Sequence, residues 1–382
     1  MTTPFDQLQQ ITDANGIDSG LDFLEQHVRR NKNYAHLFEV LKMRVRHGMG
    51  LPILYSRMRD DLDEESQRKL EDGLLAACRE VGTLLFKQGD FVHGWNYLQP
   101  VGDRHLNEKL IRSIKVNQQN ADDVIEIAVS QGAAPAYGFE ILLRHYGTCN
   151  AITTFDQAAA LHGLNCQRSM AGALLNHLYD ELVGNLVSSL PEFKTNSNDT
   201  TTLAAILDSD VLGSDNDCVI DATHLASVVR ISRILQDPKL IQKAHELARY
   251  GDGLADDLKY PGQVPFEDTY PDHLYYFAAI LGQDVDAAVD HFSKKTEQHD
   301  VEQYGGVAIE TLVDLLAKTG QNDRAVAVLV DQLLGKHQLL GIAPEPHELA
   351  KTDQQKQKLL EHYQRESDLL GFGQTLLNSK SN

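Results

Sequence analysis

The chain has 382 residues, 42% of them apolar and 24% charged, which excludes wholesale disorder and leaves room for two or three domains or one extended array of repeats. Its 55 acidic residues outnumber its 35 lysines and arginines and give a net charge of −20, so we expect no binding to nucleic-acid phosphates. The four cysteines form no CxxC pair, and the N-terminus has no basic and apolar leader. No apolar run is long enough to span a bilayer. We therefore expect a soluble cytoplasmic protein with no membrane partner.

Apolar residues recur at the spacing of an α-helix along most of the chain. The segments that show this spacing include 21–30, 37–45, 110–116 and 124–129. The two-residue alternation of a half-buried strand, flanked by hairpin turns, does not appear. We therefore predict an all-α fold.

Glycine marks many of the predicted helix ends. Gly89, Gly132, Gly282 and Gly320 each stand where a left-handed residue would end one helix, and the next helix starts within a few residues. Turns this short make consecutive helices antiparallel. Stacked antiparallel pairs form an α-solenoid, in which each pair buries its apolar face against its neighbours, and we predict one or two such arrays.

The segment around Gly89 resembles a tetratricopeptide repeat. With Gly89 as the glycine between the two helices of that roughly 34-residue pattern, Gly82 and Leu98 take its small and large apolar positions, and Gly94 stands where alanine is usual. Cys78 stands where the pattern has tryptophan. The resemblance implies a superhelix of stacked hairpins whose concave face binds a peptide or protein partner.

Two later segments, after Gly282 and Gly320, fit the second helix of the same pattern. Their matching residues are Ala287 with His291 or Phe292, and Ala325 with Leu329. The resemblance therefore extends to the C-terminal half of the chain.

Polar sequence rich in Asn, Asp, Ser and Thr over 191–218 indicates a linker that contains a short helix. This linker separates a predicted N-terminal helical domain, 1–190, from a predicted array of hairpins, 219–344. The remainder, 345–382, is expected to form an amphipathic helix over 348–377 that caps the array, and a tail.

No Walker, GxGxxG, GxSxG or HExxH motif occurs, so the candidate metal ligands are histidines near carboxylates. If helices over 221–236 and 271–282 start successive hairpins, their first turns lie at the same end of the array. The positive end of the helix dipole there favours neutral imidazoles, and these could bind one divalent metal together. The same residues also fit plain helix caps and solvated helix faces. The candidate ligands are Asp221, His224, Asp268, His273, His177 and Glu181.

His145 and Cys149 are close enough in sequence to form a catalytic thiolate pair. In the alternative interpretation, Gly147 ends one helix and Cys149 is a small buried residue.

Aromatic residues and prolines are concentrated in 258–277, a segment longer than a helix connection needs. Four of its aromatic residues are candidate ligand contacts: Tyr260, Phe266, Tyr270 and Tyr276. They would alternatively fill the groove between two hairpins.

Two functions follow from these patterns. The first is a helical-repeat scaffold whose acidic concave face binds a basic or extended polypeptide. The second is a metal-dependent hydrolase or other enzyme with a His/Asp site at the mouth of the array. The sequence indicates no organic cofactor, leaves a divalent metal open, and does not determine the oligomeric state.

Overall fold

The computed structural model describes residues 3–54, 62–190, 202–209 and 218–381. Within these ranges all regular secondary structure is helical and no strand occurs, which confirms the predicted all-α fold. No helix in the same ranges has the length and apolar content needed to cross a bilayer. The chain divides into two compact units, Met1–His145 and Tyr146–Asn382, which we describe separately.

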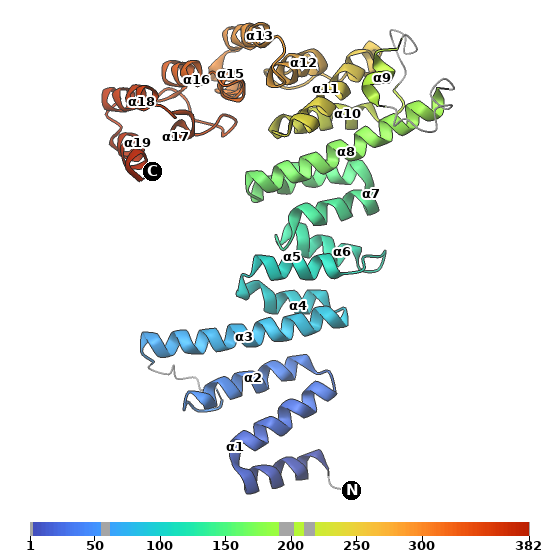
Figure 1. Ribbon diagram of the computed structural model, residues 1–382, viewed down its shortest axis with the longest axis vertical. Helices are drawn as coiled ribbons and strands as arrows, with labels where there is room; N and C mark the ends of the chain where they lie inside the picture. The colour runs from blue at the N-terminus through green and yellow to red at the C-terminus, as the bar shows by residue number, and fades with distance from the viewer. Residues whose placement is uncertain (1–2, 55–61, 191–201, 210–217, 382) are drawn as a thin grey trace. The chain divides into compact units, whose positions relative to one another are not determined.

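In the first unit, helices follow one another in chain order (Figure 1). Helices α2, α3 and α4 each pack against the helix before them. The elements are α1 (Pro4–Arg30), α2 (Tyr34–Gly48), α3 (Glu64–Gln88), α4 (Phe91–Leu98), η1 (Gln99–Val101), α5 (Arg104–Ser113), α6 (Ala121–Ile125), η2 (Glu126–Ser130) and the part of α7 (Pro135–Ala158) up to His145.

Helices α3 and α4 approach so closely that two glycines are required where they meet. A Cβ on Gly82 would lie 2.6 Å from Leu98 Cγ and 2.9 Å from the carbonyl oxygen of Gly94. A Cβ on Gly94 would lie 2.5 Å from the ring of Phe86. Gly89 ends α3 in the left-handed conformation, with φ of 89°. The residues at the small and large positions of the sequence pattern therefore do pack against one another.

The second unit starts with the remainder of α7 and ends at the C-terminus. The predicted left-handed glycines are confirmed in both units, with φ of 75° at Gly132, 81° at Gly282 and 77° at Gly320. The other elements of this unit are η3 (Ala159–Leu161), α8 (Leu164–Ser189), α9 (Leu203–Leu207), α10 (Ala222–Ile231), η5 (Ser232–Ile234), α11 (Pro238–Asp252), η6 (Asp256–Leu258), α12 (Thr269–Ile280), α13 (Val285–Gln298), α14 (Val301–Tyr304), α15 (Val307–Lys318), α16 (Asn322–Val328), η7 (Leu329–Leu333), α17 (Pro346–Leu349), α18 (Asp353–Arg365) and α19 (Leu369–Ser381).

Most helices of the second unit pack against their neighbours in the chain. Helix α11 packs against α10 and α12, α13 packs against α12 and α15, and α16 packs against α15. Helix α12 also contacts α10 and α15, so alternate helices meet as well. At the α11–α12 contact, a Cβ on Gly251 would lie 2.2 Å from the ring of Tyr270, which shows how closely the two helices approach.

The predicted linker lies only partly within the described residues. Of the predicted linker, 191–201 and 210–217 lie outside the described residues, and the predicted short helix is α9. Helix α8, before this segment, packs against α10 and α11, after it, and the division into units falls after His145 instead.

The predicted continuous helix over 348–377 is broken into separate helices. Thr352 forms a capping box with Gln355 and starts α18. Ser367, with a φ of 58°, follows the end of α18, and Asp368 then accepts the Gly371 N–H at the start of α19. Local hydrogen bonds of polar side chains thus outweigh the continuous apolar spacing.

Candidate functional site around Arg233

Arg233 lies in η5, where the end of α10 meets α15 and the loop before α12. Its Nε donates a hydrogen bond to the Arg230 carbonyl oxygen at 3.1 Å. Its guanidinium group lies 4.3 Å from the centre of the Phe266 ring, which is itself only 2% exposed. The backbone bond and the ring therefore hold the guanidinium in one place.

The Arg233 guanidinium has no carboxylate within ion-pair distance among the described residues. By contrast, Arg230 pairs with Asp156 at 2.9 Å and Arg249 pairs with Asp208 at 3.0 Å. Burial lowers the pKa of Arg233 from its ordinary value. Arginine nonetheless keeps its charge in proteins, so Arg233 is a partly buried cation without a counter-ion.

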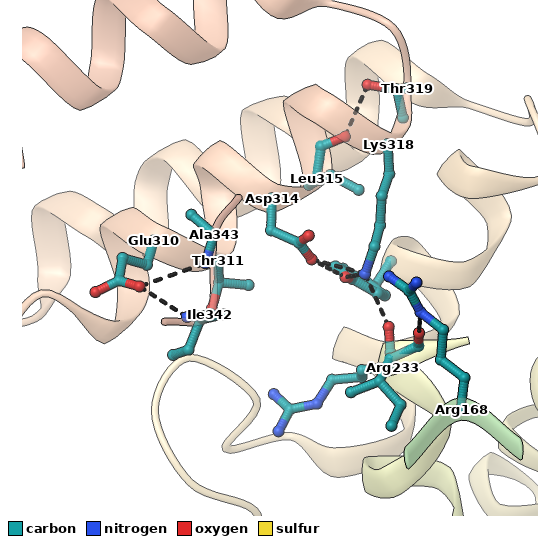
Figure 2. A network of polar contacts seen from close by, with 12 residues as sticks. Arg168, Arg233, Glu310, Thr311, Asp314, Leu315, Lys318, Thr319, Ile342 and Ala343 are labelled. Carbon is teal, nitrogen blue, oxygen red and sulfur yellow. Dashed lines mark hydrogen bonds and ion pairs between the residues drawn. The ribbon is translucent and has the colours of Figure 1, made fainter. Parts of the chain in front are cut away.

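The carboxylate of Asp314, on α15, is already engaged by two other side chains (Figure 2). Lys318 Nζ donates to Asp314 Oδ2 at 2.8 Å, to Tyr276 Oη at 2.7 Å and to the Arg233 carbonyl oxygen at 2.8 Å. Tyr276 Oη in turn donates to Asp314 Oδ2, and burial together with this carboxylate raises the pKa of Tyr276. Lys318 thus neutralises Asp314 and joins α15 to the main chain of η5.

A fourth basic residue, Arg168 on α8, reaches the same turn, and its Nε donates to the Ile234 carbonyl oxygen at 3.0 Å. Of the four, only Arg230 and Lys318 have carboxylate partners among the described residues. The positive charges of the other two are therefore uncompensated in a chain whose net charge is −20. We call the four residues the basic cluster: Arg168, Arg230, Arg233 and Lys318.

His273 lies beside Phe266, with the two ring centres 4.4 Å apart. Its Nδ1 contacts the Thr269 carbonyl oxygen at 2.5 Å, and its Nε2 has no hydrogen-bond partner among the described residues. Burial, and to a lesser extent the charge of Arg233, lowers the pKa of His273 to about 3. His273 is therefore neutral as predicted, but burial is the cause, since α12 begins at Thr269 and places His273 beyond its first turn.

A second polar network fixes the loop that carries Phe266. Lys295 Nζ, on α13, lies 2.9 Å from both Glu267 Oε2 and Asp272 Oδ2. His291 Nε2 lies 2.7 Å from Asp272 Oδ1, and His299 Nε2 lies 2.5 Å from Glu267 Oε1. Because Glu267 directly follows Phe266, these contacts hold the aromatic ring under Arg233.

Two of the six predicted metal ligands, Asp221 and His273, have side chains engaged in local contacts. Asp221 caps α10, with Oδ1 accepting from the backbone N–H of Thr223 at 2.8 Å and of His224 at 3.2 Å. Asp268 is exposed before α12, and its N–H donates to Asp272 Oδ2 at 3.0 Å. In the described part of the chain, no three His, Cys, Asp or Glu side chains are grouped so that they could hold a metal ion. Metal binding stays a prediction.

The remaining predicted polar residues lie on α7 and α8. His177 and Glu181 are both exposed on α8. His145 is the last residue of the first unit, whereas Cys149 is exposed in the second, and Gly147 breaks α7 between them with φ of 75°. Catalysis by this pair likewise stays a prediction.

The four predicted aromatic contacts differ in their exposure. Phe266, Tyr270 and Tyr276 are each at most 2% exposed and belong to the core. Tyr260 is 46% exposed and presents its ring to solvent. Direct contact with a ligand stays a prediction, and Tyr260 is the residue best placed for it.

Sequence reasoning did not identify Arg233, Asp314 or Lys318. The available signal was the placement of charged residues inside apolar runs, "VVRISRIL" and "ETLVDLLAK", because charges in such runs are buried only when they are paired or functional. No known family model matches the chain, and no curated protein or solved structure was found to be similar to it.

Proposed function

We propose that helices α10–α16 form a helical-repeat array that binds a peptide or protein partner. The observation that carries this proposal is the packing of alternate helices: α12 contacts both α10 and α15 besides its neighbours α11 and α13. A stack of helical hairpins produces this pattern, because the first helix of each hairpin meets the first helix of the next. The surface along such a stack is extended and suits an extended polypeptide.

Charge and surface chemistry support a polypeptide ligand. The net charge of −20 attracts basic segments over long distances. Tyr260 offers an exposed aromatic ring in the loop between α11 and α12. Tyrosine is enriched among the residues that dominate binding energy at protein interfaces. No observation among the described residues favours the alternative of a metal-dependent enzyme.

A peptide-selection experiment on the full chain tests this function. A random peptide library is displayed and selected, and the affinities of the enriched peptides are measured by fluorescence anisotropy. We expect Tyr260→Ala to weaken binding about tenfold, as loss of an aromatic anchor does. The matched control is Tyr146→Ala, because Tyr146 is 40% exposed against 46% for Tyr260 but lies on α7, outside the proposed array.

Equal affinities of the wild type and the two variants would contradict a role for the α11–α12 loop. Failure of any peptide sequence to be enriched over repeated selections would contradict peptide binding itself.

A further inference from the structure

We propose that Arg233 binds a carboxylate group of the polypeptide ligand. The inference rests on the proposed function and names one chemical feature of the ligand. It is carried by the geometry of a guanidinium that is fixed in place, partly exposed and without a carboxylate partner among the described residues.

The fixed position of Arg233 makes the missing partner significant. An ordinary surface arginine extends into water and needs no counter-ion. Arg233 is held by the Arg230 carbonyl and by the Phe266 ring, so part of its hydration is lost without an ion pair in return. Arg230 and Arg249, in the same unit, both have carboxylate partners. An anion supplied by a ligand would restore this missing interaction.

No nearby residue of the described chain supplies that anion. Asp314 is close enough for its charge to act on Arg233, but its Oδ2 accepts from Lys318 and Tyr276 and no ion pair with Arg233 forms. The ring of His273 stacks on Phe266, but this imidazole is neutral and cannot act as the missing anion.

The free atoms of Arg233 define how the ligand would bind. Nε is used by the Arg230 carbonyl, which leaves the two terminal Nη nitrogens. These two donors match the two oxygens of a carboxylate in an end-on pair of hydrogen bonds. A phosphate dianion fits less well, because the net charge of −20 repels a doubly charged group more strongly than a singly charged carboxylate.

The test uses side-chain NMR of ¹⁵N-arginine in the full chain, with the Arg233 Nε–Hε signal assigned from the Arg233→Lys spectrum. One probe pair is N-acetylglycine and N-acetylglycinamide, which differ in a main-chain carboxylate. The other is N-acetylglutamate methylamide, with the side-chain carboxylate free, and N-acetylglutamine methylamide. Inorganic phosphate is the fifth probe.

We expect at least one carboxylate probe to shift the Arg233 signal saturably at millimolar concentration, and its amide counterpart to leave the signal unchanged. The tighter of the two carboxylates identifies a chain terminus or an acidic side chain as the source. The Arg249 signal is the internal control and should not move, since Asp208 already occupies it. The proposal is overturned if no carboxylate shifts Arg233, if amides shift it equally, or if phosphate binds more tightly.

Peptides enriched in the selection provide an independent measurement. Arg233→Lys keeps the charge but loses the planar two-point geometry, so we expect at least about tenfold weaker binding. Arg249→Lys is the matched control, and circular dichroism verifies that both variants fold. If Tyr260→Ala weakens binding but Arg233→Lys does not, the carboxylate proposal fails while peptide binding stands. If no peptide is enriched, the NMR probes still decide whether Arg233 binds a carboxylate.

Discussion

Replacing Gly251 by alanine is expected to destabilise the second unit, because α11 and α12 have no room for a side chain there. The added Cβ would lie 2.2 Å and 2.4 Å from two ring carbons of Tyr270, whose side chain is 1% exposed. Overpacking of this kind costs up to about 3 kcal/mol, and the better helix propensity of alanine returns about 1 kcal/mol. We therefore expect a net loss of about 2 kcal/mol in the free energy of unfolding.

Gly184→Ala is the matched control, since Gly184 lies inside α8 in the same unit and a Cβ there would meet no atom of the described residues within 4 Å. This variant should gain about 1 kcal/mol from helix propensity alone. Urea denaturation followed by far-ultraviolet circular dichroism measures both changes. If Gly251→Ala is as stable as Gly184→Ala, the close α11–α12 packing described above is wrong.

Further substitutions probe three buried polar groups of the same unit, His273, Asp314 and Glu310. Because burial lowers the pKa of His273 from 6.5 to about 3, the unfolded chain binds more protons between those values, so stability is lost as pH falls through that window. His273→Asn should flatten this loss by about 1 kcal/mol per pH unit in urea titrations, and an unchanged slope would refute the assignment. Asp314→Asn leaves Lys318 without its counter-charge and should cost about 3 kcal/mol in urea denaturation. The double variant Asp314→Leu/Lys318→Met should cost less than the single variants Asp314→Leu and Lys318→Met added together. Additive losses would contradict the pairing. The carboxylate of Glu310 is fully buried and accepts hydrogen bonds from the backbone N–H groups of Leu340, Ile342 and Ala343. Glu310→Gln should therefore speed amide hydrogen exchange over 340–343. Unchanged exchange would show that the carboxylate does not hold this loop.

The features that the sequence predicted correctly are those set by local chemistry. Helical spacing and left-handed glycines such as Gly89 and Gly320 depend on a few neighbouring residues. Even the Gly82–Gly94 contact follows from a local pattern, because a hairpin with a short turn leaves few ways for its two helices to meet.

The site around Arg233 could not be predicted because it depends on contacts between segments far apart in sequence. The loop before α12 folds back to place Phe266 beneath Arg233, and Lys318 arrives from α15, 85 residues along the chain from Arg233. Two of the predicted metal ligands have contacts of their own, and metal binding stays a prediction. Asp221 satisfies the amides of its own helix, and burial of His273 depends on the same loop.

The most direct test of peptide binding by the α10–α16 array is amide hydrogen exchange of the full chain with and without a selected peptide. Our account predicts slower exchange in the segments that surround Arg233, namely α10 with η5, the loop 259–268, and the C-terminal end of α15. Exchange in α1–α6 should not change. Protection confined to α1–α6, or no protection at a saturating peptide concentration, would contradict the assignment of ligand binding to this array.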